Sequence, residues 1–230
     1  VTSSSGSFTA TFTTPVATSS SVYKVTIQSV EHKEFACSLG GTCSLGETGP
    51  GGGIVFYYSS DGFISNGVTA HYLEASVRTW QAAGYDTVLS WAVAAKDTTA
   101  VTGLSESIGA GYANSVAIVN QGNDVTTAAG KARAYTGGGK SDWFLPSYYE
   151  FNELCKFAKN EPSVSPTTLC SNGGTLNAGI SNANYQLQVE GYWISNEYSA
   201  TAGHYFYTTT AFKGYNPKSY TYKVRAIRAF

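Results

Sequence analysis

The clearest local signal in the chain is the stretch LPSYYEFNELCKFAKN, residues 145–160, which predicts an amphipathic helix. Ser147 is a typical N-cap, and Glu150, three residues later, completes a capping box. Phe151 and Leu154 follow at the spacing of one helical face. Any fold of this chain must therefore bury one side of this helix.

Further segments predict two more helices and several strands. The helices span 111–122 and 125–138, and each ends in glycine. The predicted strands are 53–60, 70–76, 89–94, 191–199, 204–212 and 222–230, and the Asn- and Gly-rich segment 171–188 is a predicted loop. Helices and strands do not alternate as βαβ units, so the predicted class is α+β, with mixed, mainly antiparallel strands and two to three helices.

Residues 1–30 differ from the remainder of the chain. The segments 7–13 and 22–29 alternate polar and apolar residues around a turn-forming segment, which predicts an N-terminal β-hairpin extension. This hairpin either ends a preceding module or belongs to the main domain. We therefore divide the chain into an extension, 1–30, and one domain, 31–230, a length that supports a substantial core.

Four cysteines, Cys37, Cys43, Cys155 and Cys170, allow three pairings. The sequence-local pairing, Cys37–Cys43 and Cys155–Cys170, closes two short loops and is the one we favour. An even cysteine count and a Ser/Thr-rich composition favour an oxidising, extracellular setting. A zinc site is the rival interpretation, and it is disfavoured because C-x-x-C is absent from the sequence and its three histidines are scattered.

The charge balance narrows the choice of partner. Charged residues make up 13% of the chain and the formal net charge is -1, without the clustered Lys and Arg that nucleic acids require. The sequence has no run of about 18 apolar residues, so no membrane span is predicted. The chain has no Met, which predicts a mature or excised segment whose signal or anchor would lie outside it.

Four motifs in order resemble a known family. GETGPGGGIVFYY, KSDWFLPSYYEFNEL, GYWISNEYS and YKVRAIRAF are similar to the DUF1566 (Legionella collagen-like adhesin C-terminal) domain, over roughly residues 43–230. The resemblance implies a variant of the C-type-lectin-like fold, related to formylglycine-generating enzymes. It also implies an extracellular domain that binds a protein or glycan on another cell or surface, without a cofactor, and that is trimeric in some relatives. The expected localisation is a cell surface or a phage particle.

A narrower resemblance concerns the C-terminal segment. Variable proteins of diversity-generating retroelements carry such domains, end in a motif similar to VRAIRAF, and vary at codons that adenine mutagenesis converts to Tyr, Ser, Thr and similar residues. Trp193, Glu197, Lys213, Lys218 and Lys223 are outside that reachable set and would be fixed. The expected ligand-binding residues are Ile194, Asn196, Ala202, His204, Tyr205, Tyr207, Thr209, Tyr215, Ser219, Tyr220 and Tyr222.

Composition supports the same expectation. Tyrosine offers a rigid contact area and a hydroxyl, and with Ser, Gly and Asn it dominates antibody paratopes. Strand propensity alone would also place some of these tyrosines in a core. We expect Phe206 and Phe212 to be buried and Tyr205, Tyr207 and Tyr215 to be exposed. The predicted core residues near the C-terminus are Trp193, Val224, Ala226, Ile227 and Phe230.

The sequence gives weaker support for phosphate binding, catalysis or a calcium site. AYTGGGKS (134–141) fits a relaxed phosphate-loop pattern, but no helix follows it, and a turn is the better interpretation. GPGGG (49–53) also lacks a following helix, so its glycines more simply allow close backbone packing. No carboxylate pair or Ser/His/Asp spacing argues for catalysis, and no cysteine follows Cys170, so we predict no enzyme activity. The acidic motifs of calcium-dependent sugar sites are not matched.

Overall fold

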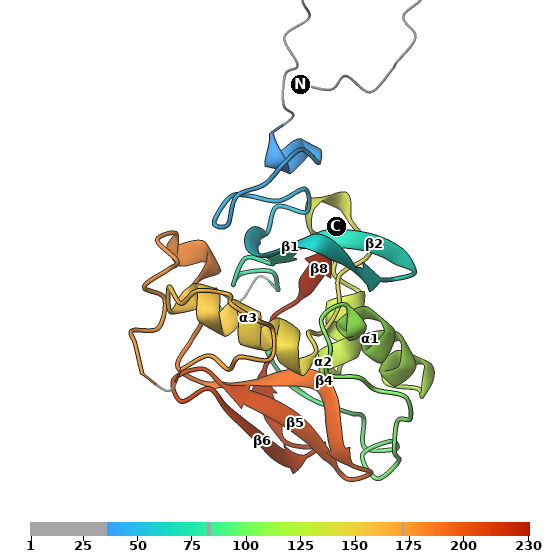
Figure 1. Cartoon of the computed structure of the whole chain (residues 1–230). Coiled ribbons are helices and arrows are strands. Elements are labelled where there is room, and N and C mark those ends of the chain that lie inside the picture. Colours follow the sequence, from blue (N-terminus) through green and yellow to red (C-terminus); the bar gives the residue numbers. More distant parts are fainter. Residues whose placement is uncertain (1–35, 82–83, 172) are drawn as a thin grey trace, which may run out of the picture. The chain divides into compact units, whose positions relative to one another are not determined.

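The computed structural model describes residues 36–81, 84–171 and 173–230. The predicted extension 1–30 lies outside these ranges. Within them the chain contains three α-helices and eight mainly antiparallel strands in two sheets (Figure 1), which confirms the α+β class. None of the described helices is long and apolar enough to cross a membrane.

The smaller sheet brings the end of the chain next to its first hairpin. It contains β1 (Ile54–Ser65), β2 (Val68–Ala75) and β8 (Ile227–Ala229), in the order β1-β2-β8, with antiparallel pairing throughout. The last strand thus extends a hairpin formed about 150 residues earlier.

The larger sheet carries most of the C-terminal segment. Its strands are β3 (Val88–Ser90), β7 (Thr221–Lys223), β4 (Gly191–Ser199), β5 (Ala202–Tyr207) and β6 (Phe212–Pro217), in that spatial order. All pairs are antiparallel except β4 with β7, which meet in parallel at Tyr192 and Lys223. Figure 1 places β4, β5 and β6 together, on the other side of α3 from β1 and β2.

All three predicted helices form. They are α1 (Ala110–Asn120), α2 (Ala128–Arg133) and α3 (Tyr148–Ala158), and short 3₁₀ turns occupy Cys37–Leu39, Gly137–Gly139 and Ala183–Tyr185. Helix α2 is shorter than predicted. The capping box at α3 is present in both directions, because the N3 amide bonds the Ser147 side chain and the Glu150 carboxylate accepts from the Ser147 amide.

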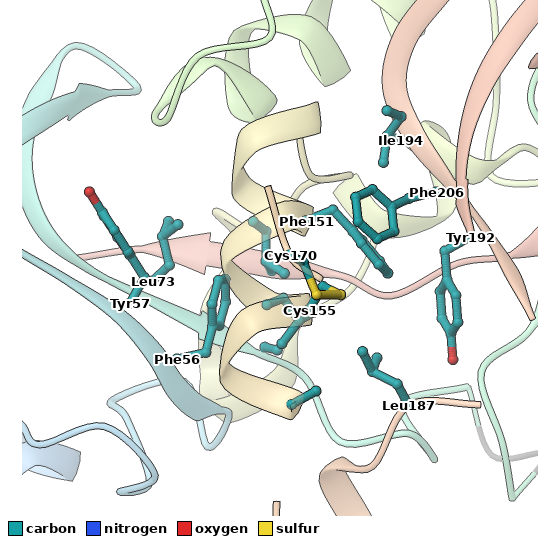
Figure 2. Close-up of a cluster of buried hydrophobic side chains, with 14 of the residues drawn as sticks. Phe56, Tyr57, Leu73, Phe151, Cys155, Cys170, Leu187, Tyr192, Ile194 and Phe206 are labelled. Atoms are coloured by element: carbon teal, nitrogen blue, oxygen red, sulfur yellow. A yellow bond between two sulfur atoms is a disulfide. The ribbon is translucent and has the colours of Figure 1, made fainter. Parts of the chain in front are cut away.

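Helix α3 packs between the two sheets and organises one of two hydrophobic clusters (Figure 2). The ring of Phe151 lies 5.1 Å from that of Phe206 on β5 and 5.2 Å from that of Tyr192 on β4. The second cluster contains Trp91, Trp143 and Trp193, all fully buried. The first cluster joins α3 to both sheets, and the second joins α1 and α2 to β4 of the larger sheet.

The two disulfides are the sequence-local ones that we predicted. Cys37 is bonded to Cys43, and Cys155 on α3 is bonded to Cys170. The second bond lies inside the α3 cluster, where Figure 2 shows it beside the helix. It therefore ties the segment that follows α3 directly to the core.

Three expectations about the strands were wrong. Residues 204–212 are not one strand: β5 ends at Tyr207, a turn follows, and β6 begins at Phe212, whose side chain is 58% exposed instead of buried. Residues 222–230 are divided between β7 and β8, in different sheets. The predicted strand 89–94 is reduced to Val88–Ser90.

The predicted core at the C-terminus is largely correct. Trp193, Val224, Ala226 and Ile227 are buried. Phe230 is only partly buried, because it lies at the edge of the smaller sheet, where its ring stacks on Tyr72 at 5.3 Å.

Candidate ligand-binding surface

The VRAIRAF motif is held in place by two buried arginines. Arg225 donates all five of its N–H groups: two reach the carboxylate of Asp86, at 2.6 and 2.7 Å, and the others reach the carbonyls of Ser76, Tyr185 and Gln186. The Tyr192 hydroxyl donates to the same carboxylate at 2.7 Å. Burial, and then the negative charge of Asp86, hold the pKa of Tyr192 well above its ordinary value.

Arg228 links three of the motifs that carry the family resemblance. Its guanidinium binds Asp142 through two nitrogens, at 2.7 and 3.0 Å, and Glu74 at 2.7 Å. Glu74 in turn accepts the amides of Gly51 and Gly53, each at 2.8 Å. Two amides of the GPGGG loop therefore donate to an internal carboxylate. The loop does not need an external anion to account for this arrangement.

Close packing also explains these glycines. A Cβ on Gly51 would lie 2.7 Å from the Trp143 ring and 2.8 Å from the Glu74 carboxylate. Gly138, in the second glycine-rich segment, has φ +61 and packs directly on the Gly51 backbone. Both segments thus have a structural role, which agrees with the close backbone packing expected for 49–53 and the turn expected for 134–141.

Three of the expected ligand-binding residues, Ile194, Asn196 and Ala202, are buried. Ile194 lies in the α3 cluster and Ala202 is largely covered. Asn196 accepts a hydrogen bond from the Tyr148 amide at 2.9 Å and donates to the Ser105 carbonyl at 2.9 Å. The Asn196 side chain therefore ties β4 to the start of α3 and to the segment that contains Ser105.

Strand alternation divides the remaining residues between the two faces of the larger sheet. Tyr205 is paired with Trp193 across β4 and β5, and its ring stacks on Tyr222 at 4.4 Å. These two tyrosine rings cover a glycine, since a Cβ on Gly191 would lie 2.6 Å from Tyr222 and 3.3 Å from Tyr205. Tyr205 and Tyr222 are therefore half-buried and pack on Trp193, so the expectation that Tyr205 is exposed is met only in part.

His204 and Tyr215 face the other side, directly opposite each other on β5 and β6. The Tyr215 ring stacks on Tyr198 with centroids 3.9 Å apart and planes 7° apart, and His204 meets Tyr198 edge-on at 5.6 Å. Tyr198 is 56% exposed and Tyr215 is 55% exposed. Tyr198 was not among the expected ligand-binding residues, although its place in GYWISNEYS, two residues after Asn196, was a usable signal.

A hollow of about 300 Å³ adjoins this stack. We call it the tyrosine hollow, and its lining residues are Tyr198, Ser199, Thr201, Ala202, Tyr215, Asn216 and Pro217. None of these described residues carries a charge. The lining offers two aromatic rings, hydroxyl groups and one proline, a combination suited to a neutral ligand with an apolar face.

His204 is fixed in one tautomer. Its Nδ1 lies 3.0 Å from the Gly214 carbonyl, which can only accept, so Nδ1 carries the proton. Partial burial lowers the pKa of His204 below its ordinary value. The ring is therefore neutral at physiological pH and adds no charge beside the tyrosine stack.

The other expected residues lie in turns or at a strand end. Ser219 and Tyr220, between β6 and β7, are exposed, while Tyr207 and Thr209 are half-buried. Lysines of the same segment are held by acidic partners: Lys213 Nζ lies 2.6 Å from Glu106, and the buried Lys218 Nζ lies 2.6 Å from Glu197. The structure therefore does not gather the eleven expected residues into one patch.

Across residues 36–81, 84–171 and 173–230, no group of three or more His, Cys, Asp or Glu side chains is arranged to hold a metal ion. The chain matches no protein-family model, and a search of curated proteins finds no match.

Proposed function

We propose that this chain is a non-catalytic recognition domain of the C-type-lectin-like DUF1566 type, which binds a protein or glycan outside the cell. Support comes from the four ordered motifs, the α+β architecture and the two disulfides, which suit an oxidising compartment. The charge balance makes nucleic acid an unfavourable partner.

One observation carries the proposal: Tyr198 and Tyr215 form a parallel stack while each stays more than half exposed. Exposed aromatic rings that cluster together without packing into the core are characteristic of binding surfaces. The stack borders the tyrosine hollow, which provides concave space for a ligand. A cluster of this kind favours recognition over a purely structural cap of a surface protein.

Binding to glycan and cell-surface protein arrays tests this function. We expect wild-type protein to select a ligand, and Tyr215→Ala to weaken that binding at least tenfold because it removes half of the stack. Tyr58→Ala is the matched control, since Tyr58 is similarly exposed, at 51%, on β1 of the other sheet. Equal binding by wild type and Tyr215→Ala would refute the proposal.

Retroelement diversification is a further part of the proposal. The exposed positions Tyr215, Ser219 and Tyr220 would tolerate replacement, whereas the buried Ile194 and Asn196 would not. Sequencing the DNA on either side of the gene tests this part of the proposal. A reverse transcriptase and a near-copy repeat that differs at adenines in codons for exposed positions would support diversification, and their absence would end it.

A further inference from the structure

Strand β6 is the outer strand of the larger sheet (Figure 1), and its free edge differs from the other sheet edges. The edge of β8 is covered by Phe144, which exchanges two backbone hydrogen bonds with Ile227, at 2.8 and 3.0 Å. Bridges to neighbouring segments also cover part of the β1 edge, at Ile54, and of the β3 edge, at Ser90. Within the described residues, β6 is paired with β5 alone.

The bonding pattern between β5 and β6 shows which backbone groups of β6 point outward. The Lys218 amide donates to the Thr201 carbonyl at 3.0 Å, so these two residues face each other as a hydrogen-bonded pair. In an antiparallel ladder, such pairs alternate with residues whose amide and carbonyl groups point away from the partner strand. Alternation from Lys218 therefore directs the backbone groups of Pro217, Tyr215 and Lys213 away from β5. No other described residue bonds the amide or carbonyl of Lys213 or Tyr215.

Lysine and proline often protect an exposed sheet edge from pairing with another strand. Lys213 does not guard this edge, because its Nζ lies 2.6 Å from the Glu106 carboxylate and 4.3 Å from the centre of the Tyr148 ring. Pro217 has no amide, so complete backbone pairing ends at Tyr215. The edge therefore offers two amides and two carbonyls, those of Lys213 and Tyr215, to an incoming strand.

The tyrosine hollow lies beside this edge, and Tyr215 belongs to both. In an antiparallel pair, a residue opposite Tyr215 has its side chain on the same face of the sheet as the Tyr215 ring. That ring lines the hollow, whose volume of about 300 Å³ and uncharged lining suit an apolar side chain. Where a peptide adds a strand to a sheet edge, backbone pairing supplies affinity and alternate side chains supply selectivity.

We infer that the β6 edge binds an extended, uncharged peptide segment of a partner protein, which adds a sixth strand to the larger sheet. The peptide residue opposite Tyr215 places an apolar side chain in the tyrosine hollow. The inference rests on the proposed function, because it names the class of partner for the same surface.

Two other occupants fit this edge less well. A second copy of β6 would pair over the same short segment, and two edges of this length supply little of the area that a stable dimer needs. A peptide also fills the hollow. A glycan presents hydroxyl groups, without the alternating amides and carbonyls that the backbone of β6 would pair with.

Backbone N-methylation of a bound peptide tests the pairing. Random linear peptides of about twelve residues are displayed on phage and selected on wild-type protein, and the tightest binder is synthesised with a single N-methyl group at each position in turn. In a paired strand, every second amide points to β6 and the others point away. N-methylation should weaken binding at least tenfold at the two positions opposite Lys213 and Tyr215, and by less than about threefold at the position between them.

Two substitutions at one position provide matched protein variants. Lys213→Pro removes the outward amide, Lys213→Ala keeps it, and both lose the ion pair with Glu106. Proline is tolerated on an edge strand where the amide that it replaces faces solvent. Lys213→Pro should bind the unmodified peptide at least tenfold more weakly than Lys213→Ala. The N-methyl series uses wild-type protein, so it does not depend on whether either variant folds.

Three results would overturn the inference. The first is that selection yields no peptide that binds. The second is that N-methyl effects do not alternate, or that Lys213→Pro and Lys213→Ala bind the peptide equally well. The third is a wild-type dimer in analytical ultracentrifugation that Lys213→Pro converts to a monomer, which would assign the edge to a second copy. If Tyr215→Ala still weakens binding on the arrays, the recognition surface stands and only the strand pairing fails, so the two failures are distinguishable.

Discussion

Arg225 and Asp86 lie 139 residues apart in sequence and form a fully buried ion pair with two hydrogen bonds, at 2.6 and 2.7 Å. The pair joins the segment before β3 to the segment that leads into β8. Because Tyr192 and three backbone carbonyls bind the same two side chains, this contact fixes the segment between β7 and β8 against β4 and the segment before β3.

We predict that Asp86→Asn destabilises the domain by about 3–5 kcal/mol, because it leaves the buried guanidinium without its counter-charge. Urea unfolding followed by tryptophan fluorescence measures the loss. Asp61→Asn, at an exposed position on β1, is the control and should change stability by less than about 0.5 kcal/mol. Similar values for the two variants would mean that the Arg225 pair is not a structural anchor.

Gly51→Ala should cost more than about 2 kcal/mol, since its Cβ would collide with the Trp143 ring and with Glu74. Gly173→Ala is the matched control, because a Cβ there meets no atom within 4 Å and the backbone does not have positive φ. Thermal unfolding of both variants checks the expectation. A stable Gly51→Ala protein would show that the loop does not need to approach Glu74 so closely.

Stability should depend on pH through Glu150. Burial raises the pKa of this carboxyl group from 4.5 to about 7, against the opposing effect of the backbone amides of Ser147, Gly109 and Gly111. The folded state therefore keeps a proton that the unfolded state has lost between pH 4.5 and pH 7. Stability contributed by this group falls as the pH rises through that window, by on the order of 3 kcal/mol.

Glu150→Gln separates this effect from other titrating groups. The variant carries no titratable group at residue 150, so its unfolding free energy should fall less than that of wild type between pH 5 and pH 7. Glu190→Gln, at an exposed position, controls for the loss of one carboxylate. Parallel pH profiles for wild type and Glu150→Gln would contradict the assignment.

The two disulfides should differ in how much each contributes to the free energy of unfolding. Cys155–Cys170 spans 15 residues and Cys37–Cys43 spans 6, so loop entropy predicts losses of about 3 and about 2 kcal/mol when each pair is changed to Ala. The first pair also lies in the core, which adds to its loss. Differential scanning calorimetry of the two double variants measures the order, and a larger loss for Cys37–Cys43 would reverse it.

Local chemistry made part of this structure predictable. The capping box at Ser147 and Glu150 fixes where α3 begins, and short cysteine spacing favours local disulfides, because both depend on residues close in sequence. The α+β class followed from the order of such local signals.

The features that the sequence did not reveal depend on distant contacts or on atypical turns. The turn between β5 and β6 has the sequence Thr208-Thr209-Thr210-Ala211, without the glycine, proline or asparagine that would predict a turn. Its left-handed residue is Ala211, at φ +52, an uncommon conformation for alanine. Phe212 was therefore assigned to the wrong strand and to the core.

The residues next to Asn196 in the sequence do not predict that its side chain is buried. Its partners, Tyr148 and Ser105, lie 48 and 91 residues away, so only the folded chain reveals that its amide is structural. An Asn codon would allow diversification at this position, but a different side chain there would lose the buried hydrogen bonds that Asn196 makes.

Hydrogen–deuterium exchange of the domain, with and without the ligand selected on the arrays, tests the central claim most directly. Residues 198–202 and 214–217 contain the lining of the tyrosine hollow, and bound ligand should slow exchange of their amides. We expect the strongest protection in these two segments and its loss in Tyr215→Ala. Protection confined to other parts of the domain, with unchanged exchange in both segments, would contradict it.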